Sequence, residues 1–305
     1  MLAPLFMRLF LAIPGVVLVV SLVFLLVRLV PGDPVSALLG DQATLVDMAA
    51  MRAALELDVP WWEQLMTGWA GILHGDLGES LVQGRAVTAM LAERAMPTLI
   101  LGAAAMSIAV AVGLVGGVVM AAGGARRQAS LETVFVALMA VPTFVLGPLL
   151  MMVFSVKLGW LPVSGFDSLG SVVLPAITLG VGLGCALARM LGGSLRDQAF
   201  ADYVRTVRAK GGSRRLRLMH ILRNALIPTV VLLCLQLGMV LTGVVLTEAV
   251  FGWPGVGTLL VEGLQGRDYP LVQGVMLVIA VGYVLANTLA DVLVRILDPR
   301  SGRAA

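Results

Sequence analysis

The residues of this chain with the clearest capacity for chemistry lie in a basic segment, residues 200–229, which reads FADYVRTVRAKGGSRRLRLMHILRNALIPT. This segment holds seven of the 21 Lys and Arg residues and a single acid, Asp202. Guanidinium and ammonium groups donate charge-assisted hydrogen bonds, so the chemistry they offer is recognition of another surface. A nucleic-acid partner is not indicated, because no stacking aromatic side chains are interleaved with the arginines.

Helical spacing divides the first part of this segment into two faces. Apolar side chains recur at i, i+3, i+4 and i+7, which is the period of one helix face. They are Phe200, Tyr203, Val204 and Val207, and the opposite face holds Asp202, Arg205, Thr206 and Ala209. Gly211 and Gly212 then predict a break, and Ser213 is a suitable N-cap for a second helix.

The second helix is predicted to be amphipathic as well. Its apolar face would hold Leu218, Ile221, Leu222 and Ala225, opposite Arg217, His220, Arg223 and Asn224. Pro228 fits the start of the next helix, where a missing N–H costs little. Two interpretations remain open: an amphipathic hairpin whose polar face binds a partner protein, and a basic loop that its charge holds on one side of a membrane.

Composition indicates an integral membrane protein. Of the 305 residues, 59% are hydrophobic and 13% are charged, against about 25% charged in soluble domains. Charged residues leave six charge-free stretches, each close to or above the ~20 residues that cross a bilayer. They are residues 9–27, 95–125, 133–156, 168–188, 224–247 and 269–290. We therefore predict an all-α polytopic membrane protein with six transmembrane helices.

Small and rigid residues within these stretches predict how the helices pack. Glycines let helix backbones approach closely, although a glycine can also act as a hinge. The glycines concerned are Gly113, Gly116, Gly117, Gly180, Gly182 and Gly184. Pro142, Pro148 and Pro175 are expected to kink the third and fourth spans. Cys185 and Cys234 fall within spans, where we expect them to be buried as small apolar residues.

The distribution of charge predicts the orientation in the membrane. With the N-terminus inside, the inner segments hold 15 of the 21 Lys and Arg residues, and the outer segments hold 13 of the 18 acids. Cytoplasmic segments of membrane proteins are enriched in Lys and Arg. Both termini are therefore predicted to be cytoplasmic.

Motifs for catalysis and nucleotide hydrolysis are missing from the sequence. A phosphate-binding G-x-x-x-x-G-K-[S/T] loop needs a lysine after a glycine, but Lys157 and Lys210 follow valine and alanine. His74 and His220 are too few and too far apart for a histidine metal site. We predict neither a catalytic site nor a metal site. The six charge-free stretches also lack the Asp, Glu or His relays of proton-coupled carriers, so energy would come from outside the chain.

A series of ordered motifs resembles the permease subunits of ABC importers of the dipeptide/oligopeptide/nickel family. D-Y-V-R-T-V-R-A-K-G and H-I-L-R-N-A-L-I-P, both within residues 200–229, are similar to the cytoplasmic loop of that family. The other matches are L-V-P-G-D-P at residues 29–34, V-F-G-W-P-G-V-G at 250–257, R-D-Y-P-L-V-Q-G at 267–274 and L-D-P-R at 297–300. The wider superfamily has Glu-Ala-Ala where this chain has Arg205, Thr206 and Val207, and the peptide branch shows similar Arg-Thr variants.

The resemblance implies the type I ABC-importer permease fold in a bacterial inner membrane. The chain would form half of a translocation pathway for di- or oligopeptides, with nickel and glutathione as alternative substrates, and would not itself be an enzyme. Expected partners are a homologous second permease, two ATP-binding subunits or domains that bind ATP and Mg, an extracytoplasmic substrate-binding protein and membrane lipid. The contact with the ATPase is assigned to Tyr203, Arg205, Thr206, Arg208, Ala209, Lys210 and Gly211. A secondary carrier or channel that works without ATP is the alternative.

The predicted organisation has three parts. Residues 1–93 are the first span with an extracytoplasmic segment, residues 94–298 are a core of five spans with the coupling loop at about 192–227, and residues 299–305 are a cytoplasmic tail. Trp61, Trp62 and Trp69 in the extracytoplasmic segment suit a membrane interface. This segment is either a contact surface for a binding protein or an ordered loop over the pore mouth.

A loop rich in Gly, Pro and aromatic residues separates the last two spans and is predicted to be a re-entrant element at the pore mouth. The pore-mouth candidates are Glu248, Trp253, Pro254 and Gly255. For Glu248 the alternative is a solvated helix end, which is the simpler explanation of a charge at the end of an apolar stretch.

Overall fold

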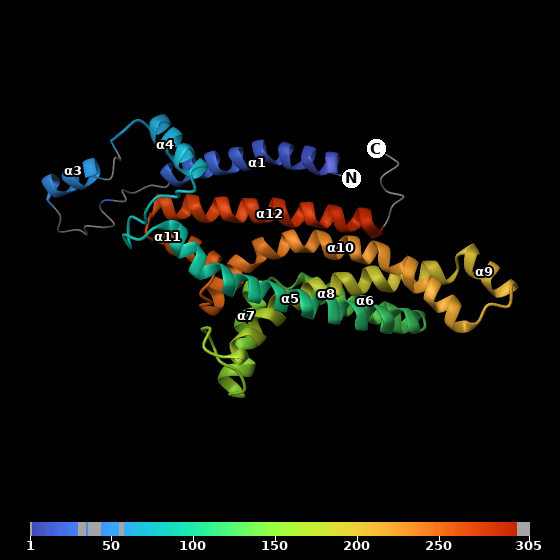
Figure 1. Cartoon of the computed structure of the whole chain (residues 1–305). Coiled ribbons are helices and arrows are strands. Elements are labelled where there is room, and N and C mark those ends of the chain that lie inside the picture. Colours follow the sequence, from blue (N-terminus) through green and yellow to red (C-terminus); the bar gives the residue numbers. More distant parts are fainter. Residues whose placement is uncertain (1, 30–34, 36–43, 55–57, 298–305) are drawn as a thin grey trace. The chain divides into compact units, whose positions relative to one another are not determined.

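The computed structural model describes residues 2–29, 35, 44–54 and 58–297, and these residues fold mainly into helices (Figure 1). In chain order the helices are α1 (Leu2–Leu29), α3 (Leu45–Ala54), α4 (Trp61–Leu73), α5 (Val87–Ala122), α6 (Ala125–Ala140), α7 (Thr143–Leu150), the π-helix η1 (Met151–Lys157), α8 (Leu169–Ala199), α9 (Asp202–Ala209), α10 (Arg214–Phe251), α11 (Val256–Gln265) and α12 (Tyr269–Leu297). Two compact units are present: Met1–Thr98 with Gly252–Gly282, and Leu99–Phe251 with Tyr283–Ala305. Residues 30–34 of the first matched motif and the predicted tail, 299–305, lie outside the described residues.

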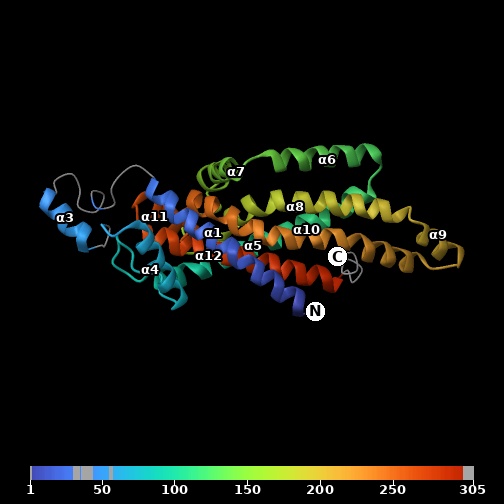
Figure 2. The same cartoon turned by 90° about the horizontal axis from the view of Figure 1, so that it is seen from above.

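Helix α8 forms the centre of the second unit. It packs against α6 and along α10, and Figure 2 shows these three helices side by side. Its buried positions are mostly small or aliphatic, including Cys185, which is a free thiol as Cys234 on α10 is. The prediction that both cysteines are buried within helices is confirmed.

Glycines bring α5 and α8 into close contact in this unit. A Cβ atom at Gly113 would lie 2.6 Å from the Cβ of Leu187, and one at Gly184 would lie 2.6 Å from the Cβ of Val112. Cβ atoms at Gly116, Gly117 and Gly180 would collide with the facing helix in the same way. Close packing, as predicted, therefore explains these five glycines. Gly182 is different, because nothing lies within 4 Å of a Cβ built there.

The third predicted span is not a single kinked helix. Helix α6 ends at Ala140, Pro142 forms the N-cap of α7, and the axis turns by 95° between α6 and the α7–η1 segment. Proline cannot continue the hydrogen-bond ladder and restricts the residue before it, and Val141 accordingly has an extended ψ of 117°. Pro148 lies inside α7, and η1 follows it.

Helix α10 corrects the expectation for Pro228. The sequence suggested that this proline starts a new helix, but α10 runs without interruption from Arg214 to Phe251 and Pro228 lies inside it. The helix is supported by α8 on one side, and a proline in a membrane helix is tolerated where neighbouring helices support the backbone. The predicted cytoplasmic hairpin and the fifth span therefore share one helix.

The first unit has a core where the start of α5, α11 and the start of α12 meet. Its buried residues are Val87, Met90, Leu91, Val256, Leu259, Leu271 and Val275. A second small cluster places Tyr269 and Val272 of α12 against Val23 of α1. These contacts join segments that are far apart in the sequence.

The prediction of a polytopic helical membrane protein is confirmed. Among the described residues, four helical segments are long and apolar enough to cross a membrane: Val87–Ala122, Leu169–Ala199, Arg214–Val240 and Tyr269–Leu293. The count rises to six if the bent pair of α6 with α7–η1 and the pair Gly243–Phe251 with Val256–Gln265 are each one span. Helix α1 also contains an apolar stretch, Phe10–Leu26. The broken pair around residues 252–255 was predicted as a re-entrant loop rather than as a span.

Candidate functional site

The basic segment forms a short helical hairpin at one end of α8 and α10. Helix α9 follows α8 and precedes α10, and both views place it at the same far end of these two long helices (Figures 1 and 2). It contacts the start of α10. The hairpin predicted from the glycine pair is therefore present.

One face of α9 is fixed to the rest of the unit. Val204 is 6% exposed. The hydroxyl of Tyr203 donates a hydrogen bond of 2.9 Å to Oε1 of Gln198, which lies in the last turn of α8. Val207 covers Gly212, since a Cβ atom at this glycine would lie 2.6 Å from Cγ1 of Val207. These contacts hold α9 against the ends of its neighbours.

The turn after α9 depends on glycine. Gly211 has φ of +75°, the left-handed region that favours glycine, and its N–H bonds to the carbonyl of Arg208 at 3.0 Å. The Gly212 N–H bonds to the carbonyl of Val207 at 2.9 Å. Ser213 then caps α10, because its Oγ accepts the N–H of Leu216 at 3.2 Å. The predicted N-cap is confirmed.

The other face of α9 is polar, cationic and open to solvent. Its exposed residues are Arg205, Thr206, Arg208, Ala209, Lys210 and Gly211. Arg205 lies 3.8 Å from Asp202, but both side chains are more than three-quarters exposed, so this ion pair contributes little to stability. The structure brings six of the seven predicted contact residues onto one exposed surface, with Tyr203 beneath them.

Phe200 does not belong to the anchored face, contrary to the sequence prediction. Its side chain is 75% exposed. The reason is that α8 ends at Ala199, Phe200 is its C-cap, and the chain turns before α9 begins at Asp202. The i, i+3 relation to Tyr203 holds only within one helix, so it does not apply across this turn.

The predicted faces of the second helix are also wrong in part. Leu218 and Leu222 are 55% and 43% exposed, whereas Ala225 is buried as expected. Arg217 is half-buried, and its Nε atom is buried with no hydrogen-bond partner among the described residues. Because this helix is the first part of α10, its orientation follows the packing of the whole helix along α8 and not the burial of its own apolar stripe.

The pore-mouth candidates lie in the interior of their units. In the first unit Trp253 is fully buried, and its indole N–H donates to the carbonyl of Pro97 at 3.0 Å. Thr98 Oγ1 accepts the N–H of Val256 at 2.8 Å, which satisfies a free N–H at the start of α11. Gly255 is buried and Pro254 is half-buried. These residues hold the start of α11 against α5.

Glu248 is not a solvated helix end. It lies in the last turns of α10 and its side chain is 0% exposed. An ionisable group at this depth is expensive and marks a functional position more often than an ordinary packing position does. The sequence suggested its solvent exposure only because an apolar stretch ends there.

Asp268 is a buried residue that the sequence interpretation missed. It is 1% exposed, and its carboxylate accepts hydrogen bonds from the Ser80 hydroxyl and from the N–H groups of Leu81, Val82 and Leu271. It therefore caps α12 and fastens the turn before α5 to it. An aspartate directly before a helix start that contains proline is an N-cap signal, so the R-D-Y-P motif contained this information.

The fold is that of a polytopic helical membrane protein, and comparison with known families identifies its class. Residues 113–303 match the family described as "Binding-protein-dependent transport system inner membrane component". The chain belongs to this family and is an ABC-importer permease of the peptide/nickel type.

Individual proteins with a similar sequence or fold are found as well. The chain is 40% identical over 289 residues to the glutathione transport system permease protein GsiC of Escherichia coli, with 94% of each chain covered. It is 41% identical over 290 residues to the protein of the same name from Pectobacterium atrosepticum, again with 94% of each covered. Among solved structures, an inward-facing form of the MetNI methionine ABC transporter matches with a TM-score of 0.56 and 17% identity over 68% of this chain and 96% of that one. This last similarity concerns the fold alone.

Proposed function

We propose that this permease subunit forms half of a translocation pathway for small peptides and that α9 transmits the stroke of separate ATPase subunits. The observation that carries the proposal is the two-sided character of α9. Val204 is buried and the Tyr203 hydroxyl is bonded to Gln198, while Arg205, Arg208 and Lys210 are exposed. A helix fixed on one side passes on a push received on the other, whereas a loosely held loop absorbs it.

The partners follow from this role. A homologous second permease completes the pathway, two ATP-binding subunits or domains bind ATP and Mg and dock on α9, and an extracytoplasmic binding protein delivers the solute. The chain itself performs no catalysis. It lies in a bacterial inner membrane with both termini in the cytoplasm, an orientation supported by the 15 of 21 Lys and Arg residues on the inner side.

Small peptides are the substrate class supported best. Glutathione is itself a small peptide, and the permeases that share 40% and 41% identity with this chain are glutathione transport system components. The substrate is therefore proposed to be a dipeptide, an oligopeptide or glutathione, ahead of nickel. Delivery by a binding protein makes that protein the main selector among these peptides.

Reconstituted transport tests this proposal. The chain is co-purified with its second permease and ATPase subunits and placed in liposomes with the binding protein. We expect uptake of labelled glutathione or of a labelled dipeptide only when ATP is hydrolysed, with competition between peptides that share the carrier. Nickel uptake is measured in the same vesicles.

Two results would contradict it. Uptake by the permease alone, at the same rate with and without ATPase subunits, would favour an ATP-independent carrier or channel. ATP-dependent uptake of nickel without uptake of any peptide would keep the ATP-driven permease but exclude the peptide substrate.

A further inference from the structure

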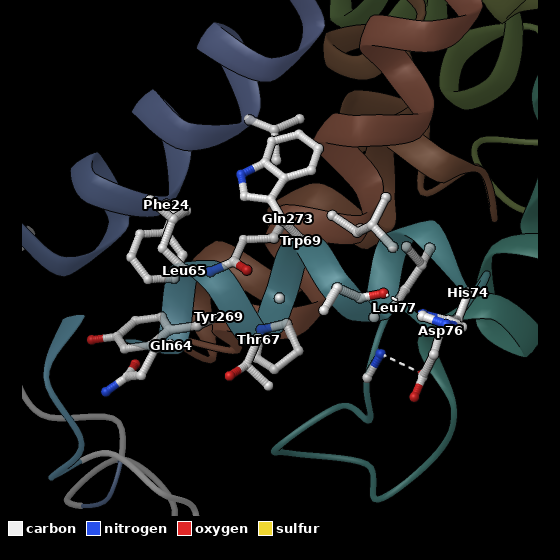
Figure 3. Close-up of a pocket in the computed structure, with 18 of the residues that line it drawn as sticks. Phe24, Gln64, Leu65, Thr67, Trp69, His74, Asp76, Leu77, Tyr269 and Gln273 are labelled. Atoms are coloured by element: carbon white, nitrogen blue, oxygen red, sulfur yellow. Dashed lines mark hydrogen bonds between the residues drawn. The ribbon is translucent and has the colours of Figure 1, made fainter. Parts of the chain in front are cut away.

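The first unit contains a cavity of about 570 Å³ that lies between α1, α4 and the start of α12 (Figure 3). Its walls are largely apolar, and the apolar lining residues include Val20, Phe24, Leu65, Ile72 and Leu77. Figure 3 shows Phe24, Gln64 and Tyr269 at one end of the cavity and His74 and Asp76 at the other. The cavity is thus an apolar space with polar groups at its ends.

A single arginine stands at the end formed by Phe24 and Tyr269. The Arg28 guanidinium lies 3.5 Å above the centre of the Phe24 ring and 5.4 Å from that of Tyr269. It donates to the Phe24 carbonyl at 3.1 Å and to Oε1 of Gln64. These four contacts are with neutral groups, so they orient the guanidinium without cancelling its charge. Three of its five N–H donors are not used by these two hydrogen bonds.

The sequence and the exposed side chains around this cavity indicate a position at the boundary between hydrocarbon and water. Arg28 is the first charge after the charge-free stretch 9–27 of α1. None of the residues of α4 is buried, although many of them are apolar. Trp61, Trp62, Met66 and Leu73 are 50% to 83% exposed. A helix with such exposed aromatic and apolar side chains is typical of the membrane interface. The Trp69 indole donates to Ser21 Oγ at 3.3 Å and holds α4 beside α1.

We propose that this cavity binds a membrane phospholipid, with the lipid phosphate on Arg28 and an acyl chain along Phe24 and Val20. Arginine binds phosphate through several N–H groups at once, which a single point charge cannot do. A phosphate ion alone is too small an occupant, since about 570 Å³ corresponds to the volume of many water molecules at ~30 Å³ each. The apolar walls require an apolar part in the same ligand.

A peptide substrate fits this cavity less well than a lipid does. Its amino group would need an acid, and the acid that lines the cavity is Asp76, at the opposite end from Gln64 and exposed to solvent. The Asp76 carboxylate is already bonded to the Gly78 N–H at 2.8 Å. Arg28 and the apolar wall beside it lie in the same order as the phosphate and the acyl chain of a phospholipid. The exposed aromatic side chains of α4 are suited to the membrane interface, where such a lipid is available.

Native mass spectrometry of the complete transporter tests this assignment. Complexes are released from membranes in a mild detergent, and the phospholipid retained on this subunit is counted after a fixed wash. Two variants alter the proposed lipid site in different ways. Arg28→Gln removes the charge, and Gly68→Leu adds a large side chain at a glycine that lines the cavity and has nothing within 4 Å of a Cβ built there.

Matched controls repeat each change away from the cavity. Arg85→Gln removes an exposed arginine of the same unit, one that is paired with Glu93. Gly15→Leu adds the same side chain to α1 at a glycine that also has nothing within 4 Å of its Cβ position. We expect Arg28→Gln to lower lipid retention about tenfold or more, which is the effect of losing a charge-assisted hydrogen bond. Gly68→Leu should also lower lipid retention, because the added side chain competes with the lipid for space, and both controls should match the wild type.

Three outcomes would overturn the proposal. The first is equal retention of phospholipid by the wild type, the two site variants and the two controls. The second is displacement of the lipid, or equal thermal stabilisation, by inorganic phosphate alone, which would leave a simple anion site. The third is displacement by a dipeptide or glutathione, which would make the cavity a peptide site. Lipid retention is read without transport, so its failure is distinct from failure of the proposed import activity.

Discussion

Gly211 is the residue on which the geometry of the helical hairpin between α9 and the start of α10 depends most directly. Its φ of +75° is unfavourable for residues with a Cβ atom, and most of all for β-branched ones. A Gly211→Val change keeps every charge of the hairpin and leaves open space around the new side chain, because nothing lies within 4 Å of its Cβ position. Any effect therefore comes from the backbone, at a cost of about 1–3 kcal/mol.

We expect the Gly211→Val subunit to insert and assemble normally but to lose substrate-stimulated ATP hydrolysis and uptake. Gly124→Val is the matched control, since Gly124 also faces open space but has φ of −68°, which valine tolerates. Full uptake by Gly211→Val, together with full uptake by Arg205→Lys combined with Arg208→Lys, would leave these arginines with a role in topology only.

Single residues also show where sequence analysis succeeds and where it fails. Ser213 was predicted as an N-cap because capping is a local property of the chain, and the structure confirms it. Phe200 was misplaced because the helical period was carried across a helix end. The interpretation of Glu248 as a solvated helix end is wrong because its burial depends on neighbouring helices, which the local pattern of charges does not contain.

Helix packing in the second unit rests on the glycines between α5 and α8. Gly184→Leu is expected to lower the thermal stability of the purified complex, because a Cβ there would lie 2.6 Å from the Val112 Cβ and 3.0 Å from the Ala109 carbonyl oxygen. Overpacking of this kind typically costs about 1–3 kcal/mol. Gly182→Leu is the control on the same helix, with nothing within 4 Å of its Cβ position. Equal unfolding temperatures for the two variants would argue against glycine packing as the basis of this contact.

At the level of elements, the six charge-free stretches were sufficient to predict where the apolar helices lie. Where these helices bend, break or continue was less predictable. The turn of 95° after α6 and the uninterrupted passage of α10 through Pro228 are both proline sites with opposite outcomes. The two sites differ at the backbone: Val141, before Pro142, is extended with ψ of 117°, whereas α10 stays helical on both sides of Pro228. Neighbouring helices lie against both segments, so the local proline signal alone does not predict which outcome occurs.

The whole molecule carries a strong charge asymmetry along its predicted topology. The proposed inner segments have a net charge of +10 and the outer segments have −7, although the whole chain has only +3. Such a separation is typical of a chain with both termini in the cytoplasm. The same predicted topology has the exposed cationic face of α9 and the Arg126–Arg127 pair at the start of α6 on one side of the membrane.

Labelling of single cysteines tests this topology in intact cells. The native cysteines, Cys185 and Cys234, are both buried, so a membrane-impermeant maleimide should give little background. Gln83→Cys, Ala125→Cys and Ala209→Cys introduce thiols at exposed positions. We expect Gln83→Cys to be labelled from outside, and Ala125→Cys and Ala209→Cys only after the membrane is permeabilised. Labelling of Ala209→Cys from outside would contradict a cytoplasmic location of α9. It would also contradict the proposed contact of α9 with an ATP-hydrolysing partner.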